Sequence, residues 1–212
     1  MIFDIEMQKE VMGAAMWGLK KFKIKRLIKK LKSMQEGRVH NQSNAEDLKK
    51  EMAGYHKLAI IYQSLVGKKK YPYAREMILE CYRAATKIDD PIAQYILGKD
   101  LLQEARFREN LQLEGVFASP SNERQMSQLY EEAHAYLLAA EQLNHFEAKR
   151  MRGLCYINGW GVGLDKKTGF ELIVDSIEQE NSWDKVPQIF ASMGLNKPEF
   201  FSALTQRRSN KS

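Results

Sequence analysis

The chain has 212 residues, a formal net charge of +6, 44% hydrophobic residues and 28% charged residues, which is ordinary for a soluble globular protein. It has no apolar run of 18 residues, which excludes a membrane-spanning helix, and its two cysteines exclude a disulfide framework. The acids Asp4, Glu6 and Glu10 near the start argue against a signal peptide. We therefore expect a protein of the reducing cytoplasm, either free or peripheral at a membrane.

The positive charge is concentrated in the N-terminal segment. Residues 1–40 contain ten Lys or Arg and four Asp or Glu, so this segment accounts for the whole excess of +6. Residues 41–212 contain 23 residues of each sign. We predict a basic N-terminal helix and linker over 1–40, a neutral helical domain over 41–206, and a disordered basic tail over 207–212.

Residues 1–35 are predicted to form one long amphipathic helix. Its apolar residues recur at helical spacing from residue 24 to residue 34, basic residues fill the positions between them, and no acid occurs from 11 to 35. The residues that we select for docking are Trp17, Phe22, Lys25, Arg26, Leu27, Lys29 and Leu31.

Three interpretations of this helix remain open. Its apolar stripe can pack on the first helix pair and leave the lysines in water. Alternatively, the helix can dock on an anionic membrane surface or in an acidic groove of a partner protein. Nucleic-acid binding is the least supported, because we expect no exposed aromatic side chains on the basic face and find no nucleic-acid-binding motif.

The middle of the chain is predicted to be a series of helices. A polar linker at 36–44 precedes a helix over about 45–66, which begins with Asn44 as its N-cap. A helix over about 73–88 follows, and Asp90-Pro91 starts another that extends to about residue 105.

The second half begins with an insertion. Residues 106–127 are expected to form either a lengthened helix or an ordered loop whose apolar residues pack on the domain. A helix over 123–143 follows, and Asn144 is the predicted N-cap of the next, with Glu147 completing a capping box. The last predicted helices, 166–180, 184–193 and one from Pro198 to about Gln206, close the domain with apolar side chains.

The most informative segment spans residues 148–165 and predicts a helix, a glycine turn and the start of a second helix. Its pattern is Ala148-x4-Gly153-x2-Tyr156-x2-Gly159-x-Gly161-Val162-x2-Asp165. The small residues let a partner helix approach, and the tyrosine adds apolar surface to the same face. The two later glycines permit positive φ after the helix ends, and the aspartate caps the next helix.

Part of this pattern occurs twice. Ala84-Ala85 and Ala139-Ala140 lie 55 residues apart, and the same step separates Ala93 from Ala148 and Gly98 from Gly153. A weaker third copy occurs around 54–67. The step from Ala139 to Ser176 is only 37 residues, so the longer step contains an insertion of about 18 residues.

This pattern resembles the Sel1-like repeat, a relative of the tetratricopeptide repeat. The second half departs from the family, with Gly169 in place of alanine and Ser176-Ile177 in place of Ala-Ala. The resemblance covers roughly 45–182 and implies an all-α fold: a short right-handed α-solenoid of two to three helix pairs, with the N-terminal amphipathic helix before it and a helical C-terminal cap. Its structural residues are Ala93, Gly98, Ala139, Ala140, Ala148, Gly153, Tyr156, Gly159, Gly161 and Asp165.

No catalytic or metal-binding arrangement emerges from the sequence. The four histidines have no Cys or His neighbour at metal-ligand spacing, and Cys81 and Cys155 lie at positions predicted to face the core. The glycine run 159–163 lacks the preceding strand and the Gly-Lys-Ser/Thr of a phosphate-binding loop. We expect no enzyme activity, no metal and no cofactor.

Two residues of the central motif are candidates for partner binding. Arg152 stands where the family has a core leucine, so it is expected to be either exposed or salt-bridged, and Trp160 lies between two turn glycines. Arginine and tryptophan are enriched in binding hot spots. Together with Lys149, Arg150 and Asn158 they form the predicted partner-binding set, with packing of Trp160 on its neighbouring turn as the alternative.

The resemblance implies a scaffold or adaptor, since stacked helix pairs present an extended surface to other proteins. We expect a non-enzymatic adaptor that binds a protein partner through the solenoid, with the N-terminal helix contacting a second partner or a membrane. Bacterial members of this repeat family often serve secretion pathways. One form of the adaptor role is therefore a subunit of a larger, secretion-type complex. The alternative is a peripheral membrane protein that binds anionic lipid through residues 1–35.

Overall fold

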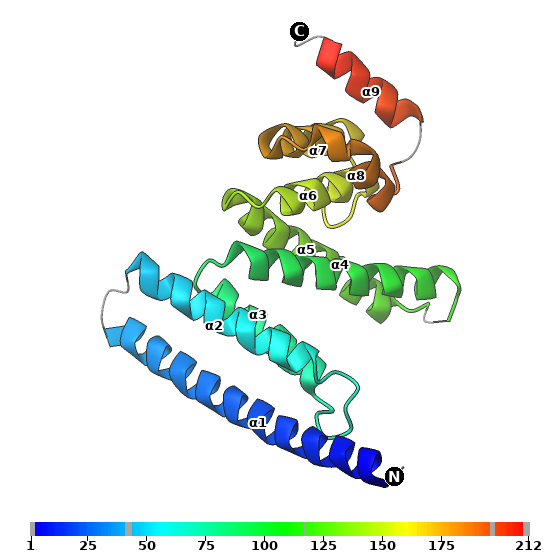
Figure 1. The fold of residues 1–212 in the computed structure, drawn as a ribbon. Helices are drawn as coiled ribbons and strands as arrows, with labels where there is room; N and C mark the ends of the chain where they lie inside the picture. The colour runs from blue at the N-terminus through cyan, green and yellow to red at the C-terminus, as the bar shows by residue number, and fades with distance from the viewer. Residues whose placement is uncertain (1–2, 41–43, 117, 196–197, 210–212) are drawn as a thin grey trace. The chain divides into compact units, whose positions relative to one another are not determined.

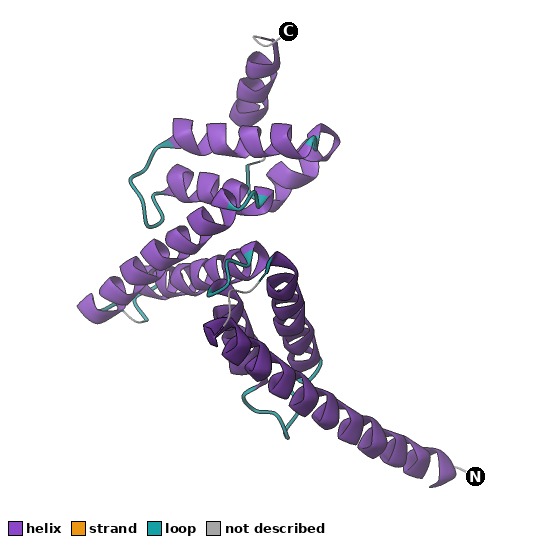
Figure 2. Ribbon diagram, turned by 90° about the vertical axis from the view of Figure 1, so that its left-hand side faces the viewer, coloured by secondary structure: helices purple, strands orange, loops and turns teal. Residues whose placement is uncertain are grey.

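The computed structural model describes residues 3–40, 44–116, 118–195 and 198–209. These residues form nine α-helices and one short 3₁₀ helix, and no strand occurs among them (Figures 1 and 2). The predicted all-α class is therefore confirmed. The chain divides at Asp90/Pro91 into two compact units, which we call unit 1 (to Asp90) and unit 2 (from Pro91).

Unit 1 contains α1 (Phe3–His40), α2 (Ala45–Gln63) and α3 (Ala74–Thr86). Helix α2 packs on both of the others and supplies the largest share of the core, with Tyr55, Leu58, Ala59 and Tyr62 buried. Asn44 caps α2 as predicted, because its side-chain oxygen accepts a hydrogen bond from the amide of Asp47 at 2.8 Å.

The linker predicted at 36–44 is wrong for most of its length, since α1 continues to His40 and residues 41–43 lie outside the described residues. Contacts with α2 favour the added turn. Gln35 donates a hydrogen bond to the hydroxyl of Tyr55 at 2.6 Å, and Arg38 pairs with the buried carboxylate of Glu51 at 3.4 Å. These long-range contacts outweigh the weak helix propensity of Gly37.

Unit 2 contains two long antiparallel helix pairs followed by shorter helices. Its elements are α4 (Pro91–Leu113), α5 (Pro120–Gln142), α6 (Phe146–Asn158), α7 (Lys166–Glu180), η1 (Trp183–Lys185), α8 (Val186–Ser192) and α9 (Pro198–Ser209). Helix α4 packs on α5, α6 packs on α7, and α5 joins the two pairs by packing on α6. Figure 1 shows these pairs as neighbouring layers from green to orange.

Small residues allow the helices of unit 2 to pack closely, as predicted. Ala93, Ala140 and Ala148 are completely buried, whereas Ala139 and Tyr156 are only partly buried. A Cβ atom placed on Gly98 would lie 2.9 Å from Cγ of Leu137 in α5. Glycine therefore permits the short distance between α4 and α5.

The insertion takes the form of longer helices. Helix α4 extends to Leu113 and α5 begins at Pro120, capped by the Ser119 hydroxyl, which accepts from the Asn122 amide at 3.1 Å. The loop alternative, with packed apolar residues, is wrong at its centre: Leu113 is 80% exposed and Val116 is 62% exposed.

The predicted cap of α6 is also wrong by one residue. His145 is the N-cap, and its Nδ1 accepts a hydrogen bond from the Ala148 amide at 3.2 Å. Asn144 instead adopts a positive φ of 63° after α5, a conformation that asparagine tolerates better than most residues. The His145 ring also stacks on Tyr95 with ring centres 4.5 Å apart, so it contributes both a cap and a packing contact.

The C-terminal helices close the core of unit 2. Phe190, Leu195 and Leu204 are buried and belong to one cluster with Ile173 and Ile177 of α7, as predicted for a cap. Helix α9 continues to Ser209, so the tail predicted from residue 207 is helical at its start, and 210–212 lie outside the described residues.

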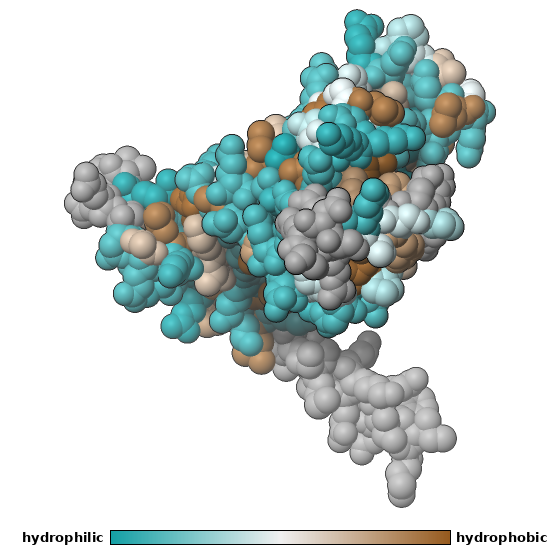
Figure 3. All heavy atoms as spheres, turned by 90° about the horizontal axis from the view of Figure 1, so that it is seen from above, coloured by the Kyte–Doolittle hydropathy of each residue, from teal (hydrophilic) through white to brown (hydrophobic). Residues whose placement is uncertain are grey.

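The face of the molecule shown in Figure 3 is mainly hydrophilic. On the face shown in Figure 3, hydrophobic residues appear as separate patches between hydrophilic ones. No helix in the described part of the chain is long and apolar enough to cross a membrane.

Candidate partner-binding groove

The glycine turn after α6 is held against α5. Gly159 ends the helix with φ 73°, and Gly161 follows with φ 69°, as the sequence predicted. A Cβ atom on Gly161 would overlap the carbonyl group of Tyr130. Only glycine therefore allows the turn to lie this close to the backbone of α5. Asp165 then caps α7 by accepting from the amide and the hydroxyl of Thr168, at 3.0 and 2.7 Å.

This turn fixes the position of Trp160. The indole is partly buried and packs against both hydrophobic clusters of unit 2. It lies parallel to the ring of Tyr130, with ring centres 6.0 Å apart, and the guanidinium carbon of Arg106 lies 4.9 Å from the indole centre. The predicted alternative was packing of Trp160 on its neighbouring turn; the ring does pack inside unit 2, but its ring contacts are with Tyr130 of α5 and Arg106 of α4.

Tyr130 connects this aromatic group to α4. Its hydroxyl donates a hydrogen bond to Glu109 at 2.7 Å. Burial, the hydrogen bond to Glu109 and the negative charge of Glu109 all raise the pKa of Tyr130, so the phenol stays protonated and the hydrogen bond persists through the physiological range.

An open groove of about 560 Å³ lies along these side chains. Its volume is within the range of roughly 300–1,000 Å³ that ligand and peptide sites occupy. Its charged lining residues are three carboxylates, and its apolar lining comes mainly from aromatic and aliphatic side chains. We call it the Trp160 groove, and its residues are Glu109, Glu123, Met126, Ser127, Tyr130, Glu131, Asn158, Gly159, Trp160, Gly161 and Val162.

Of the five predicted partner-binding residues, only Asn158 and Trp160 line this groove. Asn158 is exposed and donates a hydrogen bond to the carbonyl of Leu154 at 2.9 Å. The three basic residues, Lys149, Arg150 and Arg152, make contacts with neighbouring helices inside unit 2 instead.

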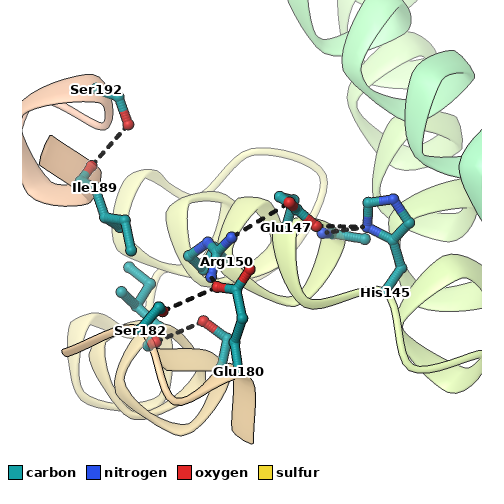
Figure 4. A network of polar contacts seen from close by, with 10 residues as sticks. His145, Glu147, Arg150, Glu180, Ser182, Ile189 and Ser192 are labelled. Atoms are coloured by element: carbon teal, nitrogen blue, oxygen red, sulfur yellow. Dashed lines mark hydrogen bonds and ion pairs between the residues drawn. The ribbon is translucent and has the colours of Figure 1, made fainter. Parts of the chain in front are cut away.

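Arg150 joins α6 to the end of α7, as Figure 4 shows. Arg150 is 8% exposed, and its guanidinium lies 2.6 Å from the carboxylate of Glu180, which also accepts from the Ser182 hydroxyl at 2.9 Å. A second carboxylate, on Glu147, lies 3.7 Å away. Lys149 lies near the same helix and donates to Gln179 at 3.3 Å. Both residues therefore contact the end of α7 within unit 2, and their part in a partner-binding face stays a prediction.

Arg152 contacts α5 on the other side of α6. Its guanidinium pairs with Glu141 and contacts Nε2 of His134 at 3.4 Å. Burial, and then the charge of Arg152, lower the pKa of His134, so the imidazole stays neutral and can accept this hydrogen bond. Of the two predicted states for Arg152, the salt-bridged one is correct.

The Arg150–Glu180 pair predicts an acid-sensitive contribution to stability. Burial raises the pKa of Glu180, but the hydrogen bonds from Arg150 and Ser182 and the charge of Arg150 lower it more, and the net shift is below the ordinary value of 4.5. The pair therefore stabilises the fold above pH 4.5 and loses this effect as the pH falls through the lower, folded-state pKa. Arg150→Met is expected to cost about 2 kcal/mol at pH 7.

The measurement is urea unfolding of wild type and Arg150→Met at pH 7 and at pH 3. The difference in free energy of unfolding is expected to shrink at the lower pH, because protonated Glu180 no longer attracts the guanidinium. Lys166→Met, at an exposed position of α7, is the control and is expected to change stability little at either pH. A difference for Arg150→Met that is the same at both pH values would contradict the pairing.

The two cysteines lie in the core. Cys81 and Cys155 are buried, as predicted, and burial raises the pKa of each thiol to about 12, so both stay protonated. No group of three or more His, Cys, Asp or Glu side chains among the described residues is placed to hold a metal ion.

The N-terminal docking residues divide between two faces of α1. Leu31 is buried on α2 and Leu27 is half-buried beside it, whereas Phe22 is 65% exposed. Lys25, Arg26 and Lys29 are exposed. Trp17 lies in α1 but outside the residues whose side chains the structure describes. The expectation that the basic face carries no exposed aromatic is therefore wrong, because Phe22 is one.

Sequence reasoning missed the residues that build the groove around Trp160. Tyr130 lay within the predicted helix over 123–143, and Arg106 and Glu109 fell within the predicted insertion. Their helical spacing, three residues apart on α4, was the available signal, but nothing in the sequence placed α4 beside the glycine turn.

Comparisons of the chain with protein-family models, with curated proteins and with solved structures find no match. The likeness to a repeat family therefore depends on the residues of the sequence motif alone.

Proposed function

We propose that the chain is a non-enzymatic adaptor that binds a protein partner in the Trp160 groove. In this proposal the helix pairs α2–α3, α4–α5 and α6–α7 are successive Sel1-like repeats of a short right-handed α-solenoid. The close glycine contacts of Gly98 and Gly153 and the positive φ of Gly159 and Gly161 support this interpretation, since they have the roles that the repeat motif requires.

The observation that carries the proposal is the fixed tryptophan at the edge of an open groove. Trp160 is held by Tyr130 and Arg106 before any partner arrives, so binding costs little side-chain entropy there. Rigid aromatic side chains in such positions dominate binding energy in many interfaces. The carboxylates of Glu109, Glu123 and Glu131 add specificity for a partner segment that presents lysine or arginine.

The groove predicts a charge-dependent loss of partner capture. Glu131→Lys reverses an exposed carboxylate of the groove and is expected to lower partner affinity about tenfold or more, because a partner cation would then face a lysine. Trp160→Ala is expected to lower it about thirtyfold or more, as for a central hot-spot residue. The measurement is affinity co-purification of full-length protein from its native extract, quantified by mass spectrometry.

Matched variants separate loss of binding from loss of folding. Glu132→Lys changes the neighbouring exposed glutamate, which does not line the groove, and Leu164→Ala removes a 66% exposed side chain close to the same turn. Both are expected to retain the partner. If Glu132→Lys lost the partner as fully as Glu131→Lys, the groove would not be the binding site. A protein that captured no specific partner would contradict the adaptor role itself.

A further inference from the structure

The two faces of α1 have different environments. The inward face packs on α2, where Ile24 is 7% exposed and Leu31 is 4% exposed. Lys20 and Gln35 belong to the same face and make hydrogen bonds to Ser64 at 3.1 Å and to Tyr55 at 2.6 Å. The helix is therefore anchored in unit 1 without using its opposite side.

The outward face combines exposed apolar and basic side chains. Leu19 is 59% exposed and Phe22 is 65% exposed, three residues apart on the helix. Arg26 lies four residues after Phe22, and Lys29 lies seven residues after Phe22, so the three side chains project from the same side of the helix. We call Leu19, Phe22, Lys25, Arg26 and Lys29 the outward face of α1.

The basic side chains of this face have no local counter-charge. No acid occurs in the sequence from residue 11 to residue 35. Among the described side chains, no carboxylate forms an ion pair with Lys25, Arg26, Lys29 or Lys30, whereas Lys32 lies 4.0 Å from Glu36. A surface with this much unbalanced positive charge attracts an anionic partner over about a Debye length.

A separate groove lies along the seam between α1 and α2, on the side of α1 that faces α2. Three lysines line it, Lys30 from α1 and Lys50 and Lys57 from α2, above an apolar floor. Its volume is about 240 Å³, and the floor residues are Leu27, Leu31, Met34, Ala53 and Gly54. Lys50 is already paired with Glu46 at 2.8 Å and Asp47 at 3.8 Å, so this groove is not part of the docking surface proposed below.

We propose that α1 docks on an anionic phospholipid surface, with Leu19 and Phe22 entering the interface and Lys25, Arg26 and Lys29 contacting lipid phosphates. The alternation of apolar and cationic side chains along an exposed helix suits a membrane interface, where both kinds of contact are available side by side. A nucleic acid would use the charges but would leave the aliphatic Leu19 without an apolar environment. This site is separate from the Trp160 groove, so either proposal can fail alone.

The test is co-sedimentation of the full chain with vesicles of phosphatidylcholine alone and of phosphatidylcholine mixed with phosphatidylserine. Binding is expected only to the mixed vesicles and is expected to weaken as salt is raised. The triple variant Lys25→Gln/Arg26→Gln/Lys29→Gln is expected to bind roughly a hundredfold more weakly, since each basic residue near such a surface contributes about fivefold. Phe22→Ala is expected to bind about tenfold more weakly.

A second triple variant controls for net charge. Lys99→Gln/Lys166→Gln/Lys167→Gln removes the same charge from exposed positions of unit 2 and is expected to bind as wild type does. Unchanged helical circular dichroism will show that each variant is folded. The proposal is overturned if wild type does not bind mixed vesicles at low salt, if both triple variants lose binding equally, or if single-stranded RNA or an acidic protein binds α1 more tightly than the vesicles do.

Discussion

Replacing Phe190 with alanine is expected to lower the free energy of unfolding of unit 2 by about 3–5 kcal/mol, the largest effect that we predict for a single substitution. Phe190 is completely buried in the cluster formed by α6, α7, α8 and α9. Its ring lies 6.5 Å from Phe170 and 5.2 Å from Phe201. Removing it leaves a cavity that the surrounding helices can only partly fill, so the loss includes contacts as well as buried area.

The measurement is urea unfolding followed by tryptophan fluorescence, since Trp160 and Trp183 both pack against this cluster. Phe201→Ala is the matched control: the same ring is removed from a position that is 37% exposed, and the expected cost is about 1 kcal/mol. Equal losses for the two variants would show that α8 does not close the core of unit 2.

This prediction tests a requirement of stacked helix pairs. In unit 2 the pair α4–α5 packs on the pair α6–α7 through α5 and α6, so the far side of α7 needs a cover of another kind. In unit 2 that cover consists of η1, α8 and α9, whose buried side chains contact Ile173 and Ile177 of α7. The sequence predicted this role because its last apolar residues had no further repeat to pack against.

The part of the fold that the sequence predicted best is the helix–turn–helix around residues 148–165. Each element there depends on a local interaction: Gly159 and Gly161 have positive φ, and Asp165 caps the helix that begins at the next residue. Local backbone requirements of this kind can be predicted from the residue types alone, because glycine permits positive φ and aspartate caps helices. The start of α4 at Pro91 was predicted for the same reason.

The parts that the sequence did not predict depend on contacts distant in sequence. The cap of α6 moved to His145 because its ring stacks on Tyr95, fifty residues earlier. The cationic residues Lys149 and Arg150 contact α7 about thirty residues later, at Gln179 and at Glu180. A basic side chain on an isolated helix looks available for a partner, and only the fold shows which carboxylate it already contacts.

The same reasoning explains the two predictions for α1. The apolar stripe and the docking face were treated as alternatives, but they occupy opposite sides of one helix. Helical spacing places Ile24 and Leu31 together and places Phe22 and Arg26 on the other side. The sequence did not predict which side of α1 is covered by α2, because that depends on the packing of Leu31 against Gly54.

Replacing Gly153 with alanine is expected to lower the free energy of unfolding of unit 2 by about 2–3 kcal/mol, although alanine favours a helix more than glycine does. A Cβ atom at this position would lie 2.6 Å from the carbonyl oxygen of Gly169 and 2.6 Å from Cγ1 of Ile173, both in α7. The nearest atom belongs to the backbone, so rotating a side chain cannot relieve the overlap and the two helices must move apart.

Gly37→Ala is the control for this substitution, because Gly37 lies in α1 with no atom within 4 Å of an added Cβ. There alanine is expected to stabilise unit 1 by about 0.5–1 kcal/mol, the ordinary gain from helix propensity and reduced freedom of the unfolded chain. Urea unfolding of both variants measures the two effects with opposite signs. If Gly153→Ala were also stabilising, α6 and α7 would not cross as closely as Gly153 and Gly169 indicate. Close helix contact would then not explain the small residues of the motif.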